Sequence, residues 1–193
     1  MKHIKILILS LLVSLVSLPS WGEQYYSDLV KDNDLYYTKH SDVPYTGKVK
    51  SYVGLMTGYI QDGLKEGTWK LYWEVGKLFA LETFKKGYPH GPNKNYYENG
   101  QLKQSYTVKS TWVDGLWDGQ VQEGNYFYYY ENGQLEETLN YKDGNLEGPR
   151  ISYYENGQVK VMQYFRKGIE VGVSEYFNED GSLEKTHDTG FSR

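Results

Sequence analysis

The side chains that most often perform acid–base chemistry or bind metals are few or repetitive in this 193-residue chain. It has four histidines and no cysteine, and no spacing among them matches a metal site. The carboxylates Glu98, Glu131 and Glu155 each precede an Asn-Gly pair, and this repetition favours a structural role at a turn over a unique general acid. No phosphate-binding loop, dinucleotide fingerprint or nucleophile elbow occurs. We therefore expect a protein that is not an enzyme and that uses no metal or cofactor.

Side chains suited to binding a partner are concentrated in one segment instead. Trp112 and Trp117 lie next to Asp114 and Asp118. Tryptophan is one of the usual anchors of protein interfaces, so we predict that these four residues contact a partner. The alternative is a longer hairpin whose tryptophans fold back onto a sheet.

The segment Tyr-Tyr-Glu-Asn-Gly-Gln recurs along the chain and organises it. It occurs at residues 96–101, 129–134 and 153–158, and weaker copies occur at 72–77 and 177–182. The anchoring glycines are spaced by 24, 33, 24 and 24 residues; they are Gly76, Gly100, Gly133, Gly157 and Gly181. A period in this range indicates a repeat architecture.

The Asn-Gly pairs predict β-hairpins. We expect two-residue type I′ turns at Asn99-Gly100, Asn132-Gly133 and Asn156-Gly157, since Asn and Gly tolerate φ > 0 best. Alternation along the strands then places an apolar set on a core face: Trp73, Leu78, Ala80, Phe84, Tyr97, Leu102, Tyr130, Leu135, Leu139, Tyr141, Tyr154, Val159, Val161 and Phe165. The other face keeps Tyr96, Tyr129 and Tyr153, which we predict to meet solvent or a partner. Trp69 and Trp73 are both expected to fill the core.

A second turn closes each unit and completes the predicted fold. Pairs such as Asp143-Gly144 and Lys167-Gly168 are followed four residues later by another glycine. Each unit therefore reads as strand, Asn-Gly turn, strand and glycine-rich turn. The sequence predicts an all-β antiparallel meander of hairpins, an extended twisted sheet of about five to six repeats of ~24 residues.

This pattern of Tyr-Tyr-x-Asn-Gly-x-Leu, an aromatic residue and x-Gly-x-x-x-Gly resembles the MORN-type repeat in its bacterial variant form. Chains built of that variant are commonly described as YwqK-like antitoxins. The resemblance runs from about Pro44 to Glu184. It implies a scaffold, a membrane-associated module or a protein-binding surface.

The break in the repeat adds nine residues between Gly100 and Gly133, four around residues 107–111 and five around residues 120–128, and the interrupted segment carries both candidate tryptophans. Insertions in repeat proteins often map to the binding face.

The remaining segments give the predicted domain organisation. Residues 1–22 combine a basic start, an apolar stretch and a small-x-small site, and so predict a cleaved secretory signal peptide. Residues 23–43 form a cap segment or a loose terminus, residues 44–184 form the repeat domain, and residues 185–193 form a short polar tail. With no cysteine for a lipid anchor, we expect a periplasmic protein, with secretion as the alternative.

Three functions fit these features. The first is an exported immunity protein that neutralises an envelope-acting protein toxin encoded next to it. The second is an envelope-binding module for cell-wall glycan or phospholipid, and the third is a structural scaffold without a toxin partner. The net charge of −4 argues against nucleic acid as a partner. The sequence leaves the oligomeric state open.

Overall fold

The computed structural model describes residues 22–74 and 76–191. The predicted signal peptide of residues 1–22 therefore lies, apart from Gly22, outside the described part of the chain. No helix among the described residues is long and apolar enough to cross a bilayer.

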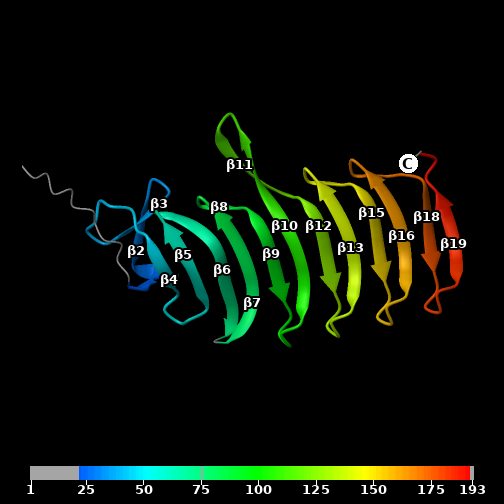
Figure 1. Ribbon diagram of the computed structural model, residues 1–193, viewed down its shortest axis with the longest axis horizontal. Helices are drawn as coiled ribbons and strands as arrows, with labels where there is room; N and C mark the ends of the chain where they lie inside the picture. The colour runs from blue at the N-terminus through cyan, green and yellow to red at the C-terminus, as the bar shows by residue number, and fades with distance from the viewer. Residues whose placement is uncertain (1–21, 75, 192–193) are drawn as a thin grey trace, which may run out of the picture.

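The fold is an elongated, twisted sheet in which the strands follow one another in chain order (Figure 1). The first elements are β1 (Gln24–Tyr25), a 3-10 helix (Tyr26–Asp28), β2 (Leu29–Asp32), β3 (Leu35–Thr38), β4 (Gly47–Lys50), β5 (Met56–Gln61), β6 (Leu64–Glu74), β7 (Lys77–Lys85), β8 (Tyr88–Pro89) and β9 (Gly91–Tyr96). The remaining strands are β10 (Leu102–Val113), β11 (Leu116–Gln122), β12 (Gly124–Tyr129), β13 (Leu135–Lys142), β14 (Asn145–Leu146), β15 (Gly148–Tyr153), β16 (Val159–Arg166), β17 (Ile169–Glu170), β18 (Val173–Phe177) and β19 (Leu183–Asp188).

Antiparallel pairing of neighbouring hairpins confirms the predicted meander. Within β15 and β16, for example, Ile151 faces Met162 and Ser152 faces Val161. The exception is β1, which runs parallel to β4. β2 and β3 form a separate two-stranded sheet, so the described strands make one 17-stranded sheet and one hairpin beside it.

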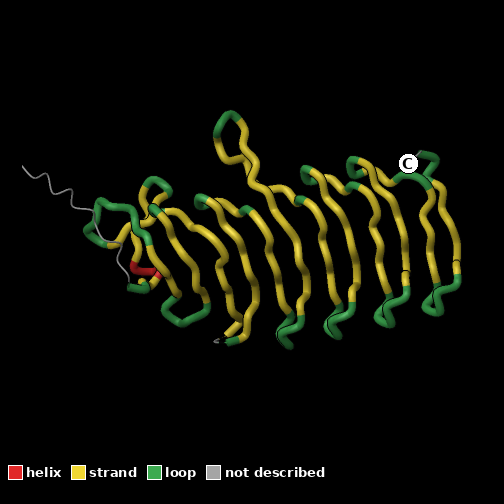
Figure 2. The backbone as a smooth tube through the Cα atoms, viewed as in Figure 1, coloured by secondary structure: helices red, strands yellow, loops and turns green. Residues whose placement is uncertain are grey.

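The turns lie in two rows, one along each long edge of the molecule (Figure 2). The predicted type I′ geometry is wrong for the Asn-Gly pairs, which form the lower row. Only the glycine has a positive φ there, +86° at Gly157, and a bulge follows it. Tyr154 N–H donates to the Gln158 carbonyl and Gly157 N–H to the Tyr154 carbonyl, which defines a three-residue loop with glycine in the left-handed position.

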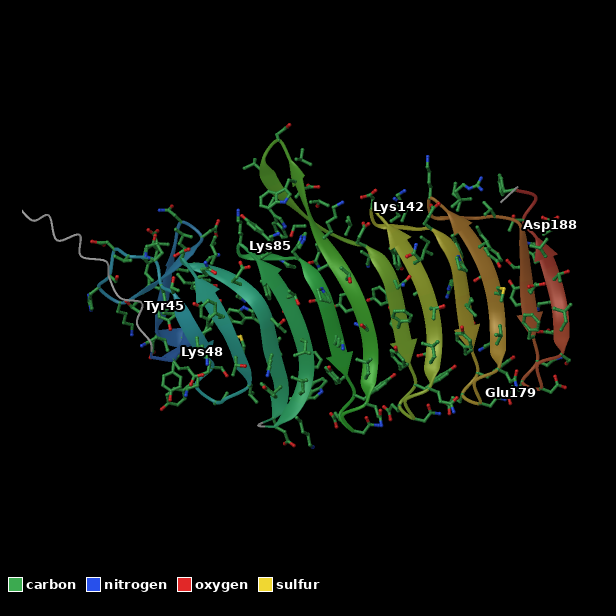
Figure 3. The ribbon with its side chains drawn as sticks, viewed as in Figure 1. Tyr45, Lys48, Lys85, Lys142, Glu179 and Asp188 are labelled. Atoms are coloured by element: carbon green, nitrogen blue, oxygen red, sulfur yellow. The ribbon has the colours of Figure 1, made fainter. Side chains whose placement is uncertain are left out.

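Type I′ turns occur instead in the upper row. Both central residues have positive φ in each pair: Asp62-Gly63, Lys86-Gly87, Asp114-Gly115, Asp143-Gly144 and Lys167-Gly168. Figure 3 labels Lys85 and Lys142 beside this row and Glu179 in the lower row.

The best-buried part of the molecule is its N-terminal end. Tyr45, Val49, Ile60 and Trp69 form a buried cluster there. The segment before residue 44 packs against it through Tyr26, Leu29 and Tyr36. Two backbone hydrogen bonds, Tyr36 N–H to the Gly63 carbonyl and Tyr45 N–H to the Tyr36 carbonyl, join β3 to the first turns of the main sheet.

The predicted core face is only partly buried over the rest of the sheet. Of its members, Ala80 and Leu139 are buried, Trp73 is 50% exposed, and the others are half-buried. The prediction for Trp73 is wrong because β6 and β7 shift register between Leu71 and Glu74, so alternation from the buried Trp69 does not continue. Along most of the sheet no second layer formed by residues 22–74 and 76–191 covers either face (Figure 1).

The C-terminal strand extends beyond residue 184, where the predicted repeat domain ends. β19 pairs with β18 as far as Asp188. Thr189 then donates through both its N–H and its hydroxyl to the Gly172 carbonyl, and Gly172 N–H donates to the Phe191 carbonyl.

Candidate functional site

The structure places the predicted partner-binding residues in two separate groups. Trp112, Asp114, Trp117 and Asp118 lie on the β10–β11 hairpin, which projects beyond the upper row of turns (Figure 1). The tyrosines lie at the other end of the strands, next to the lower row: Tyr96 ends β9, Tyr129 ends β12 and Tyr153 ends β15. The two groups cannot contribute to one contact site at a single end of the sheet.

The projecting hairpin exists because β10 and β11 pair with each other beyond the length of a regular unit. Their ladder runs from Val108 opposite Gln122 to Val113 opposite Leu116, with a register shift after Thr111. The apolar side chains of the hairpin are exposed to solvent: Trp112 is 50% exposed, Trp117 46% and Leu116 75%. Asp114 and Asp118 are exposed as well.

Both tryptophans rest on Tyr88, a residue that the sequence analysis did not single out. The Tyr88 ring lies 4.7 Å from the Trp112 ring in an edge-to-face arrangement and 5.6 Å from the Trp117 ring. Such aromatic contacts fix the direction of the hairpin while leaving about half of each indole accessible. The two tryptophans therefore pack back on Tyr88 of the sheet and still leave surface exposed that a partner could contact.

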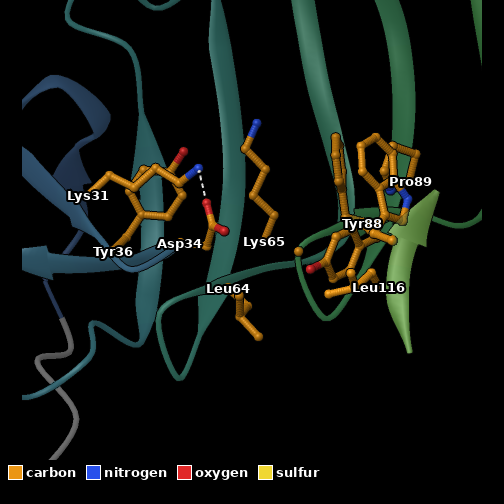
Figure 4. Close-up of a pocket in the computed structure, with 11 residues that line it drawn as sticks. Lys31, Asp34, Tyr36, Leu64, Lys65, Tyr88, Pro89 and Leu116 are labelled. Carbon is orange, nitrogen blue, oxygen red and sulfur yellow. Dashed lines mark ion pairs between the residues drawn. The ribbon is translucent and has the colours of Figure 1, made fainter. Parts of the chain in front are cut away.

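A groove of about 620 Å³ lies between this hairpin and the N-terminal segment (Figure 4). Leu116, Trp117 and Tyr88 line one side. Tyr36 and the ion pair between Lys31 and Asp34, 2.8 Å apart, line the other. The groove therefore lies between the two parts of the described chain that depart from the repeat.

Lys65 lies between these two sides and places a cation in the groove. Its ammonium group lies 4.4 Å from the Trp69 ring centre, 4.9 Å from that of Phe84 and 5.4 Å from that of Tyr26. Burial lowers the pKa of Lys65, and the nearby Glu82 carboxylate partly offsets this effect. A cation–π arrangement of this kind keeps a partly dehydrated charge in place and able to receive an anionic group.

Neither Lys65 nor the aromatic residues around it carried a sequence signal of function. The groove is formed by residues from β2, β3, β6, β7, β8 and β11, several of which are far apart in the chain. The aromatic content of residues 23–43 was the one available hint. Among the described residues, no group of three or more His, Asp or Glu side chains could hold a metal ion.

The tyrosine pairs of the lower row link one unit to the next. The hydroxyl groups of Tyr97, Tyr130 and Tyr154 donate to main-chain carbonyls of the following unit, those of Tyr129, Tyr153 and Phe177, at 2.8, 2.7 and 2.8 Å. The amides of Asn99 and Asn156 make parallel bonds to the Glu131 and Glu179 carbonyls. Tyr129 and Tyr153 thus have a structural role as acceptors.

Comparison with protein-family models gives four matches to the family described as MORN repeat variant, over residues 65–86, 89–110, 122–143 and 146–167. The chain is therefore similar to this repeat family over these four segments. Each MORN repeat is one hairpin around a lower turn, and the tip of the projecting hairpin, residues 111–121, lies outside all four. A search of curated proteins found no match.

Proposed function

We propose that this MORN-repeat protein is an exported immunity protein that binds a protein toxin acting in the cell envelope, and that it acts by binding rather than by catalysis. The observation that carries the proposal is the pair of half-exposed tryptophans on the projecting hairpin: Trp117 lines the groove beside Lys65, and Trp112 packs on Tyr88, which also lines it. Accessible tryptophans next to a charged group in a recess are typical of the energetic centre of a protein interface.

The rigidity of the sheet supports binding to a preformed partner surface. The lower turns are joined from unit to unit by phenol–carbonyl bonds. The upper turns are joined by a second set, in which the Glu66, Glu123 and Glu147 carboxylates accept from the N–H groups of Lys86, Asp143 and Lys167. A surface held in this way loses little conformational entropy on binding, and this favours affinity.

Two sequence features support the toxin-neutralising role. The repeats resemble those of YwqK-like antitoxins, and residues 1–22 have the composition of a signal peptide. An immunity protein against an envelope-acting toxin is needed in the periplasm, which is where such a signal would direct it.

Co-purification tests the proposed interaction. The full chain is produced together with the product of the adjacent gene, and the periplasmic fraction is purified through a tag on the toxin. We expect a stable complex, and we expect Trp112→Ala with Trp117→Ala to weaken it by about 2–4 kcal/mol, the range of interface hot spots.

Trp73→Ala is the matched control, since Trp73 is also 50% exposed but lies near the lower row. The proposed surface is wrong if Trp73→Ala weakens the complex as much as the double variant does. The proposed function is wrong if the wild-type chain forms no complex.

A further inference from the structure

The β6–β7 turn of the lower row lacks the link to the next unit that the turns after Tyr97, Tyr130 and Tyr154 make. In the later units a tyrosine follows the first aromatic residue of the motif, and its phenol bonds to the next unit. The first unit carries Trp73 at this position. An indole cannot reproduce the phenol, and among the described residues the Trp73 indole N–H makes no hydrogen bond.

A second groove, of about 570 Å³, lies at this place in the lower row, between the first unit and the next. Trp73 and Phe79 form an aromatic wall, with ring centres 4.4 Å apart. Tyr96 and Tyr97 also line the groove. It lies at the opposite end of the strands from the groove beside Lys65.

The polar groups of this groove are amides and carboxylates. Asn95 and Gln104 can each donate and accept, and Glu98 and Glu131 accept, while the Asn99 amide is engaged with the Glu131 carbonyl and Gln101 N–H. A hydroxyl group also donates and accepts, so this set matches a ligand with several hydroxyls around an apolar ring face.

Lys103 is the one cation among the described residues that line this groove, and its position argues against a cationic ligand at the Tyr97 ring. The Lys103 ammonium lies 5.3 Å from the centre of the Tyr97 ring and so already occupies the cation–π position there. A cationic ligand such as choline would have to displace this ammonium to use the Tyr97 ring.

We propose that this lower groove is a carbohydrate-binding site in which a neutral pyranose ring stacks on Trp73. The amide and carboxylate side chains would hydrogen-bond its hydroxyls. The site is independent of the toxin-binding surface, since the two grooves share no lining residue.

Isothermal titration calorimetry of the full chain with chitotriose, cellotriose and maltotriose tests the proposal. We expect saturable binding of at least one of the three. Trp73→Ala should weaken it about tenfold or more, while Trp112→Ala should leave it within about twofold.

Trp73→Tyr provides a variant that keeps the fold. It installs the phenol that ties neighbouring turns in the later units, so we expect it to close the groove and abolish sugar binding without lowering the melting temperature. Sugar binding that survives both Trp73 variants would overturn the proposal. Absence of binding by all three sugars, or binding of choline alone, would also overturn it.

Discussion

Each repeated tyrosine of the lower row contacts the next unit through its phenol oxygen. The Tyr130 hydroxyl lies 2.7 Å from the Tyr153 carbonyl of the next unit, and Tyr97 and Tyr154 repeat the contact. A meander with no second layer has few other contacts between adjacent hairpins beyond the strand ladder itself. These phenols therefore stabilise the spacing of the turns.

Removing one phenol should have a measurable cost. We expect Tyr130→Phe to lower the free energy of unfolding by about 1 kcal/mol, since the Tyr153 carbonyl loses a donor and the ring stays in place. Urea denaturation measures the change. Tyr59 is 39% exposed and is not one of the tyrosines that bond to the next unit. Tyr59→Phe should therefore change the free energy of unfolding by less than about 0.5 kcal/mol. Equal effects of the two substitutions would show that the phenol–carbonyl bonds between units do not contribute to the free energy of unfolding.

Gly58 shows a different constraint at the residue scale, close packing against a ring. A Cβ atom at this position would lie 2.2 Å from the Trp69 indole, which is 1% exposed. We expect Gly58→Ala to destabilise the protein by about 2–3 kcal/mol or more, because the buried indole must move.

Gly100→Ala is the control, since nothing lies within 4 Å of its added Cβ and its cost comes from φ of +86° alone. That cost is about 1–2 kcal/mol. If the midpoint of urea denaturation for Gly58→Ala equals that of the wild type, the described packing of Trp69 is incorrect.

The two turn types show which parts of the hairpin a sequence pattern can predict. The existence and spacing of the hairpins followed from the Asn-Gly pairs and the 24-residue period. The turn type did not, because a bulge after the glycine moves Val159 opposite Tyr153 instead of Tyr154. Asn-Gly fits both a two-residue and a three-residue loop, and the choice depends on hydrogen bonds such as that from Tyr154 N–H to the Gln158 carbonyl.

The type I′ turns of the upper row offer a stabilising substitution. Lys167 has φ of +50°, a conformation that asparagine adopts at lower cost than lysine. We expect Lys167→Asn to raise the free energy of unfolding by about 0.5–1 kcal/mol. Differential scanning calorimetry would show this as a higher melting temperature.

Lys94→Asn is the matched control, because Lys94 is an exposed residue within β9 and has no positive φ. Asparagine is disfavoured in strands, so this change should be neutral or slightly destabilising. A gain at Lys94 equal to that at Lys167 would contradict the explanation from turn geometry.

At the scale of the whole molecule, the array ends differently on its two sides. The N-terminal segment covers the first strands through β1 and the Tyr26–Tyr36 pair. In the last unit Asn178 and Asp180 replace the tyrosine and asparagine that link earlier units, and both bond within their own turn to Ser182. The last unit therefore offers neither of these two donors to a further repeat.

The candidate site is formed by strands that are far apart in the chain, so only part of it could be predicted from the sequence. Trp112 and Trp117 were recognised because they interrupt the period. Tyr88 and Lys65 were not, because only the fold brings β6 and β8 between the N-terminal hairpin and the projecting one. The separation of the predicted tyrosines from the tryptophans follows from the meander itself, because successive turns lie at opposite ends of the strands: the tyrosines flank the Asn-Gly turns and the tryptophans flank the Asp114-Gly115 turn.

The most direct test of the proposed immunity role is the survival of cells that export the adjacent gene product to their periplasm. We predict that the full chain restores growth, that Trp73→Ala restores it equally, and that the Trp112→Ala and Trp117→Ala double variant does not, although it is exported and folded. Growth restored equally by the double variant would contradict the proposed surface. Failure of the wild-type chain to protect would contradict the role itself.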